Sequence, residues 1–232
     1  MCSASASTST SSRTSFADVS KRLARPRGAC LVLGAVLALP ANAQQARIFE
    51  PQAIVDWEAH AFEGRTEYRL GRKAGRPAVE AHCADGASGL FFRGEIDLEE
   101  TPVIEWRWFV ARPPDGPDET TRAGDDFAAR LYAVDENSLL PWRTRALNYV
   151  WTRSRPVGTA WPNPFAEQAR MIAVQAGPAD GWVTERRNLR ADFRRYHARD
   201  PQSLDAIAIM TDCDNTGVAR RAWYGTIRLL PE

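Results

Sequence analysis

The sequence predicts an all-β protein, an antiparallel jelly-roll-like β-sandwich with one short helix near residues 188–200. Short segments rich in Val, Ile, Trp, Tyr and Phe recur along the chain, separated by Gly, Pro, Asp and Asn. About eleven such segments follow one another, whereas helical spacing of apolar residues occurs in a single stretch. Many short strands with turn residues between them are typical of sandwiches and jelly rolls.

The first 43 residues have the layout of a secretory signal peptide. A basic cluster, Lys21 to Arg27, precedes the apolar run "GACLVLGAVLALP", and Ala41-Asn42-Ala43 is a small-x-small cleavage site. An uncleaved membrane anchor is the alternative, but an apolar run of about a dozen residues is too short to cross a bilayer. We therefore expect cleavage after Ala43 and a periplasmic or secreted protein. Its mature chain, residues 44–232, is expected to be a single β-sandwich domain without a membrane span.

The charge of the predicted mature chain argues against two classes of partner. The prefix contains five basic residues and one acidic residue, so 25 basic and 28 acidic residues remain, a net charge of −3. Proteins that bind nucleic acid or anionic membrane surfaces usually carry a basic patch or an excess of positive charge. We therefore expect no nucleic-acid partner, and the oligomeric state stays open.

The individual elements follow from local patterns. Strands are expected at 53–58, 66–70, 77–83, 89–97, 102–110, 126–134, 146–153, 169–175, 182–188, 204–211 and 221–230, with loops at 112–126, 161–165 and 176–181. The helix is predicted because Leu189, Phe193 and Tyr196 fall on one helical face. Asn188 is expected to cap its N-terminus, and Pro201 to end it.

Alternation along the strands separates the expected core from the polar faces. In "VIEWRWFV", Trp106 and Trp108 share one face, and two tryptophans at this spacing indicate core packing. Arg107 points the other way, and similar alternation places Arg130 and Asn148 on polar faces. These positions predict a polar sheet face that meets either a ligand or only water.

The stretch "TDCDNTG", residues 211–217, ends an apolar strand with several oxygen-bearing side chains. Asp212, Asp214 and Asn215 are the kind of ligands that calcium prefers. The loop is not an EF-hand, because the position of the bidentate Glu is taken by Trp223. The alternative is a tight turn in which Gly217 adopts positive φ. If these acids meet the Asp125-Asp126 pair, the repulsion among four carboxylates requires a cation.

Known catalytic motifs are missing from the sequence. There is no G-x-S-x-G segment, no glycine-rich phosphate loop and no paired Cys or His spacing for zinc. Paired carboxylates remain as an alternative, since sandwich enzymes cleave polysaccharides with two of them. Glu185 with Asp212 or Asp126 would be that pair.

Two cysteines, Cys83 and Cys213, lie in the predicted mature chain. In an oxidising compartment an even pair of cysteines indicates a disulfide, and each lies near the end of a predicted strand.

Three segments carry a resemblance to a known family. "GDDFAARLYAV" (124–134), "ALNYVW" (146–151) and "IAIMTDCDNTG…AWYGTIRL" (207–229) resemble the exported bacterial proteins grouped as domain of unknown function 3047. The resemblance covers nearly all of the predicted mature chain and implies no particular activity. Position 213 departs from the family pattern, where a Thr-like residue is expected in place of Cys. The last strand, "RAWYGTIRLLPE", also resembles galactose-binding-like jelly rolls, whose fold implies a sugar-binding face and a structural calcium; Thr226 stands where an acid is often found.

These observations lead to one expected function and two alternatives. We expect a non-catalytic protein that binds a carbohydrate or another cell-envelope ligand. At the 212–215 loop the sequence favours the tight turn, and a structural calcium stays open as the other reading. The alternatives are the polysaccharide-cleaving enzyme described above and an envelope scaffold or interaction protein. The expected ligand-binding residues are Asp125, Asp126, Arg107, Arg130, Asn148 and Trp161.

Overall fold

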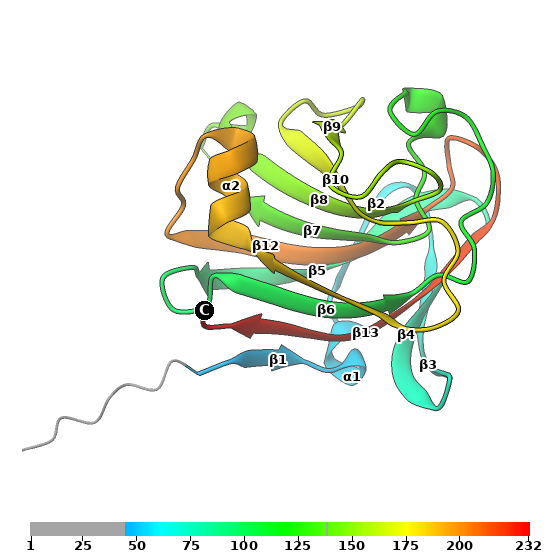
Figure 1. The fold of residues 1–232 in the computed structure, drawn as a ribbon, viewed down its shortest axis with the longest axis horizontal. Coiled ribbons are helices and arrows are strands. Elements are labelled where there is room, and N and C mark those ends of the chain that lie inside the picture. Colours follow the sequence, from blue (N-terminus) through cyan, green and yellow to red (C-terminus); the bar gives the residue numbers. More distant parts are fainter. Residues whose placement is uncertain (1–44, 138) are drawn as a thin grey trace, which may run out of the picture. The chain divides into compact units, whose positions relative to one another are not determined.

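The computed structural model describes residues 45–137 and 139–232, which fold into two packed β-sheets (Figure 1). The six-stranded sheet has the order β11-β6-β13-β4-β3, and β1 pairs with β13. Its strands are β1 (Arg47–Phe49), β3 (Glu67–Lys73), β4 (Arg76–Cys83), β6 (Val103–Phe109), β11 (Val183–Asn188) and β13 (Arg220–Leu230).

The seven-stranded sheet has the order β2-β5-β12-β7-β8-β10-β9. Its strands are β2 (Glu58–Gly64), β5 (Gly86–Asp97), β7 (Arg130–Asp135), β8 (Arg145–Thr152), β9 (Ala160–Pro162), β10 (Ala169–Ala176) and β12 (Ser203–Asp212). The helices are α1 (Pro51–Ile54) and α2 (Leu189–His197), together with 3-10 turns at Arg122–Gly124 and Pro141–Arg143. The predicted β-sandwich is therefore confirmed.

An aromatic cluster joins the two sheets. Trp106 and Trp108 of β6 are almost fully buried, as their spacing predicts. Their rings contact Tyr149 and Trp151 of β8, with centroids 5.3 Å and 5.7 Å apart. Large offset aromatic pairs of this kind bury much apolar area and favour one sheet register. Alternation then turns the neighbouring residues of each strand away from the core.

Helix α2 lies at one end of the sandwich (Figure 1). Asn188 caps it as predicted, because its side chain accepts a hydrogen bond from Ala191 N at 2.8 Å. Leu189 and Phe193 are buried. The helix ends at His197, slightly before the predicted boundary, and Ala198 adopts the left-handed conformation at φ 51°.

Several element predictions are wrong. The strand predicted at 53–58 is not formed, because Pro51 starts the short helix α1, where its fixed φ suits the first turn; only Glu58 of this range lies in a strand, the start of β2. Strands β1, β2 and β9 were not predicted; all seven positions of β2 are exposed, so it lacks the alternation that identifies strands. The sandwich is also not wholly antiparallel, since β8 and β10 pair in parallel.

None of the helices within residues 45–137 and 139–232 is long and apolar enough to cross a membrane. The predicted signal peptide, residues 1–43, lies outside the described residues.

Candidate functional site

The side chains of the candidate site meet on the outer face of the seven-stranded sheet. Thr211 of β12 points inward, where its hydroxyl lies 2.9 Å from Tyr224 OH of the opposite sheet. Because side chains alternate along a strand, Met210 and Asp212 point outward. Arg130 of the adjacent strand β7 reaches Asp212 on this face. Arg130 and Asp212 therefore form part of a polar face on the outer side of this sheet, as the alternation of Arg130 predicts.

Arg130 is the central cation of the site. Its Nε donates to Asp212 Oδ1 at 2.8 Å, and one Nη donates to Asp212 Oδ2 and to the Asp125 carbonyl. Its other Nη lies 3.7 Å from Asp125 Oδ2. Arg130 and Asp212 are each only 2% exposed. Bidentate pairing to both oxygens is the geometry in which a guanidinium best compensates a buried carboxylate.

Burial dominates the protonation behaviour of this pair. It raises the pKa of Asp212 to about 7, against the lowering effect of Arg130 and of the hydrogen bond from Phe127 N. Burial also lowers the pKa of Arg130, but the charges of Asp212 and Asp125 outweigh it and raise that pKa well above its usual range. Arg130 therefore stays charged, and its charge favours the ionised form of Asp212 in the closed pair.

Asp126 fastens the loop that follows β12. Its Oδ1 accepts from Asn215 N at 3.1 Å and from Asn215 Nδ2 at 3.2 Å. Its Oδ2 accepts from Thr216 N at 2.7 Å and from Arg220 Nη1 at 3.3 Å. Although burial raises it, the pKa of Asp126 is lowered overall by these hydrogen bonds and by Arg220.

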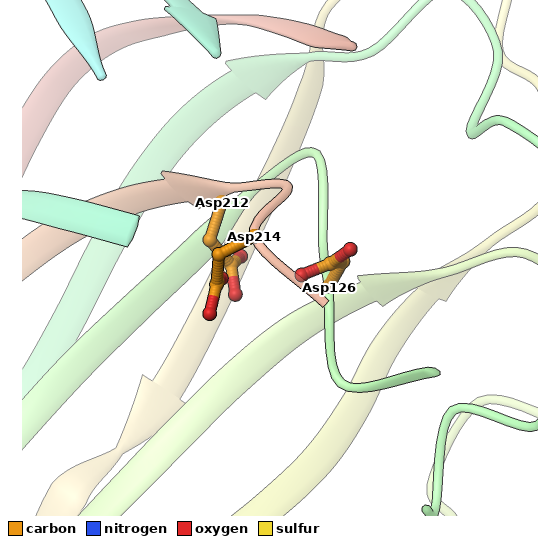
Figure 2. Close-up of side chains that lie close together, drawn as sticks. All are labelled: Asp126, Asp212 and Asp214. Atoms are coloured by element: carbon orange, nitrogen blue, oxygen red, sulfur yellow. The ribbon is translucent and has the colours of Figure 1, made fainter. Parts of the chain in front are cut away.

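The acids of the two predicted pairs do meet. Asp126, Asp212 and Asp214 offer carboxylate oxygens that all lie within 4.8 Å of one another. Figure 2 shows Asp212 and Asp214 side by side at the end of β12, and Asp126 on the segment that precedes β7. Two of these acids also form ion pairs within the protein, Asp212 with Arg130 and Asp126 with Arg220.

A tight turn forms within the same loop. Gly217 adopts φ 63°, and its N–H donates to the Cys213 carbonyl at 3.0 Å. Cys213 forms a disulfide with Cys83 at the end of β4, with Cα atoms 6.0 Å apart. The disulfide thereby links the loop that follows β12 to the end of β4 in the six-stranded sheet.

A pocket of about 400 Å³ opens beside this cluster. Two exposed aromatic side chains, Phe62 and Phe165, lie on its wall. Asp125 and Asp214 also line it, and within the described part of the chain the Oδ1 atom of each is buried without a hydrogen-bond partner. The other lining residues are Glu63, Ala87, Arg130, Tyr132, Asn163, Ala166, Ala169, Met210, Asp212 and Asn215.

Burial is the first cause that raises the pKa of both Asp125 and Asp214, and the charge of Asp126 adds to it in each case. Desolvated acceptors of this kind are stabilised by donors that enter the pocket.

Two predicted ligand-binding residues do not line the pocket. Trp161 is 7% exposed and packs against Phe127, with ring centroids 6.4 Å apart, so it is not an exposed platform. Asn148 is fully buried, and its Nδ2 contacts Met171 Sδ at 3.1 Å. Trp161 belongs to the same buried cluster as Met171.

The structure does not bring Arg107 or Glu185 to this pocket. Arg107 belongs to β6, on the outer face of the other sheet. Glu185 belongs to β11 and pairs with Trp106, whose side chain points into the core, so the seven-stranded sheet separates Glu185 from Asp212. The predicted catalytic pair of Glu185 with Asp212 or Asp126 is therefore not assembled.

Sequence reasoning missed Phe62, Phe165 and Asn163. Asn163 donates to Asp125 Oδ2 at 3.0 Å, and its own Oδ1 accepts from the backbone N–H groups of Phe165 and Ala166 at 2.9 Å each. The loop signal "WPNPF" was visible, and an Asn between two prolines is a common turn former. Nothing in the sequence indicates that this turn covers the acidic cluster.

The fold and site define a β-sandwich with a polar, aromatic-flanked pocket on the outer face of one sheet. The chain belongs to the family described as "Protein of unknown function (DUF3047)", whose model matches residues 55–228. The resemblance noted from the sequence is thereby confirmed. No curated protein matches the sequence significantly.

Similar solved structures include carbohydrate-binding modules and glycoside hydrolase domains. A family 30 carbohydrate-binding module is 13% identical, with a TM-score of 0.45, and the match covers 81% of this chain and 99% of that one. The module CBM27-1 of Caldicellulosiruptor saccharolyticus, solved with mannohexaose, is 10% identical with a TM-score of 0.37, and the match covers 81% of this chain and 98% of that one. The glycoside hydrolase domain of Endo-D from Streptococcus pneumoniae R6 is 7% identical with a TM-score of 0.38, and the match covers 75% of this chain. It covers 21% of that structure, about a fifth.

Proposed function

We propose that this protein binds a carbohydrate in the pocket beside Asp125 and Asp214 and does not cleave it. One observation carries the proposal: two desolvated carboxylate oxygens without partners belong to the wall of a pocket that exposed aromatic rings flank. A sugar offers many hydroxyl donors and an apolar ring face, which match such acceptors and rings. A mostly preformed pocket with few polar groups is the usual form of a ligand site.

The test is calorimetric titration of the full chain with soluble β-glucan, mannan and xylan oligosaccharides. We expect one of them to bind, and the variants Asp125→Asn and Asp214→Asn to weaken its binding at least about tenfold, since each loses a charge-assisted acceptor. Asp180→Asn is the matched control, because Asp180 is exposed and lies outside the pocket lining. If both pocket variants bind like the control, the assignment is wrong.

The same samples are assayed for new reducing ends to test the enzymatic alternative. We expect none to appear with the unmodified chain. If the unmodified chain releases reducing ends and the Asp125→Asn variant does not, the protein is an enzyme that cleaves the polysaccharide, and the proposal of binding without cleavage is wrong.

The residues fit a structural calcium poorly at the three-acid cluster. Calcium requires about six to eight oxygen ligands. Both oxygens of Asp126 and both oxygens of Asp212 already accept hydrogen bonds from N–H groups, and among the described residues Asp214 Oδ1 is a buried oxygen of the cluster without a partner. We infer that Arg130 and Arg220 take the place that the sequence prediction gave to calcium.

We also propose that the protein is exported, to the periplasm or beyond. The disulfide between Cys83 and Cys213 supports the proposal, since disulfides persist in oxidising compartments. N-terminal sequencing of the protein recovered from a cell fraction outside the cytoplasm checks it. A chain that starts at Gln44 is expected, and an intact N-terminus in the cytoplasmic fraction would contradict it.

A further inference from the structure

A second, smaller depression lies on the outer face of the six-stranded sheet. Its volume is about 170 Å³, and its lining includes two arginines and a tryptophan. The lining residues include Arg76, Arg107, Trp182, Gly225, Thr226 and Glu50. They belong to strands of the six-stranded sheet or lie next to them, whereas the first pocket lies on the outer face of the seven-stranded sheet.

An irregularity in β13 makes room for this depression. The register of β13 against β6 shifts between Tyr224 and Ile227, so one extra residue bulges from the ladder. Gly225 occupies the bulge, where a Cβ atom would lie 3.2 Å from the Arg107 Cβ and 3.3 Å from Trp182 Cζ3. A glycine here allows the arginine and the indole to lie directly over the strand.

The two arginines of the depression have no carboxylate of their own among the described residues. Arg76 is exposed, and neither Arg76 nor Arg107 takes part in an ion pair there. Glu105, an acid on the same face, is engaged by Arg228 at 2.7 Å and approached by Arg186 at 3.8 Å. The charge of Arg76 acts unfavourably on Arg107, and an anion bound between the two guanidinium groups relieves that repulsion.

Arg107 carries the clearest sign of a missing partner. Its Nε is buried without a hydrogen-bond acceptor in the described part of the chain. Burial is the main cause that lowers the pKa of Arg107, and the charges of Arg76 and Arg228 lower it further. Glu50 also lines the depression; its carboxylate accepts a hydrogen bond from Thr226 Oγ1 at 2.7 Å and, in the described part of the chain, forms no ion pair with either arginine.

Trp182 forms an aromatic wall beside the two cations. Its Nε1 donates to the Lys73 carbonyl at 3.1 Å, which fixes the orientation of the indole. The Arg107 guanidinium lies 5.9 Å from the ring centroid. A fixed indole beside a guanidinium pair suits a ligand that has both a ring face and an oxyanion.

We propose that this depression binds an oxyanion, a carboxylate or a sulfate, carried on a sugar ring. Arg76 and Arg107 hold the oxyanion, with the fork geometry that guanidinium groups offer to two oxygens. Trp182 packs against the ring that carries it. The site is separate from the first pocket, and its two arginines favour an acidic sugar over a neutral one.

The experiment is calorimetric titration of the full chain with a galacturonate trisaccharide, its carboxyl-reduced neutral counterpart, a sulfated galactose trisaccharide and acetate. We expect an acidic trisaccharide to bind and the neutral one and acetate to bind at least about tenfold more weakly at this site. Tighter binding of the uronate or of the sulfated sugar identifies which oxyanion the site prefers. The affinity is also expected to fall as salt is added.

Three variants locate the binding. Arg76→Ala and Arg107→Gln are expected to weaken it about fivefold or more each, because each removes a charge-assisted contact. Arg221→Ala is the control, since Arg221 lies on β13 outside the lining of the depression. Asp125→Asn, in the first pocket, is expected to leave this affinity unchanged. The proposal is overturned if no acidic trisaccharide binds below about 10 mM, if Arg76→Ala behaves like Arg221→Ala, or if acetate binds as tightly as the sugar acids.

Discussion

At the scale of single residues, the candidate site depends on how buried charges are compensated. Arg130 satisfies both oxygens of Asp212, so this pair is closed and does not present its oxygens to a ligand. Asp125 and Asp214 keep one oxygen each without a partner in the described chain, and both line the pocket. Asp212 therefore joins two strands through Arg130, whereas the Oδ1 atoms of Asp125 and Asp214 can accept hydrogen bonds from a ligand.

Glu185 gives a prediction at this scale that separates a structural role from a functional one. It lies on β11 opposite Trp106, and burial raises its pKa to about 7. Between pH 4.5 and 7 the folded chain therefore holds a proton that the unfolded chain has released. Stability from this group is present at low pH and is lost as the pH rises to about 7.

The variant Glu185→Gln should remove that contribution. We expect the unmodified chain to lose about 1–2 kcal/mol more unfolding free energy than the variant between roughly pH 5 and 7.5, a value discounted for partial exposure. Urea denaturation at several pH values measures this difference. Glu167→Gln, at an exposed position, is the control. Equal pH profiles for the unmodified chain and Glu185→Gln would show that the carboxyl is not desolvated.

At the scale of elements, the loop that follows β12 forms a tight turn and also joins this strand to Asp126 and Arg220. Gly217 supplies the positive φ, Asp126 binds the loop backbone, and Arg220 binds Asp126. Because these contacts hold the loop without a metal ion, we expect calcium to raise the melting temperature of the full chain by less than about 2 °C relative to a chelator. Differential scanning calorimetry in calcium and in a chelator measures it. A shift of several degrees would restore calcium to the Asp212, Asp214 and Asn215 loop, and magnesium at equal ionic strength controls for salt.

The same scale shows what the sequence could and could not predict. Strand β6 was predicted because the burial of one face produces alternation, and β12, which is buried at every position from Ala206 to Asp212, because it is an apolar run of β-forming residues. The edge strand β2 is exposed on every residue and the three-residue β9 is too short to show a period, so neither leaves that signal. The pocket lining could therefore not be predicted in full, because Phe62 belongs to β2 and Asn163 directly follows β9.

At the scale of the whole molecule, the decisive information is which sheet each strand joins. Arg107 and Arg130 both alternate away from a core, and the sequence places them on similar polar faces. The topology puts them on opposite outer faces of the sandwich, because β6 and β7 belong to different sheets. Pairing between strands that are far apart in sequence determines this, and local patterns carry no information about it. The meeting of the acids at Asp126 and Asp212 depends on the same kind of pairing, between β7 and β12.

The disulfide joins the end of β4 to the loop that carries Asp214 and leads from β12 of the seven-stranded sheet to β13 of the six-stranded sheet. Cys83 and Cys213 are 130 residues apart in sequence, so the bond closes a long loop and restricts the unfolded chain strongly. We expect the double variant Cys83→Ser/Cys213→Ser to lose about 2–5 kcal/mol of unfolding free energy, measured by urea denaturation of the full chain.

The backbone amides of the loop are expected to report the same loss locally. Without the bond, Asn215 and Thr216 still donate to Asp126, but the loop is no longer tied to β4. Hydrogen exchange at these two amides should therefore become faster by more than the global destabilisation accounts for, while exchange in β6 should follow the global change alone. If the loop and β6 accelerate by the same factor, the disulfide stabilises the sandwich as a whole and does not position Asp214. In that case the geometry of the pocket depends on Asp126 and Arg220 without the covalent link.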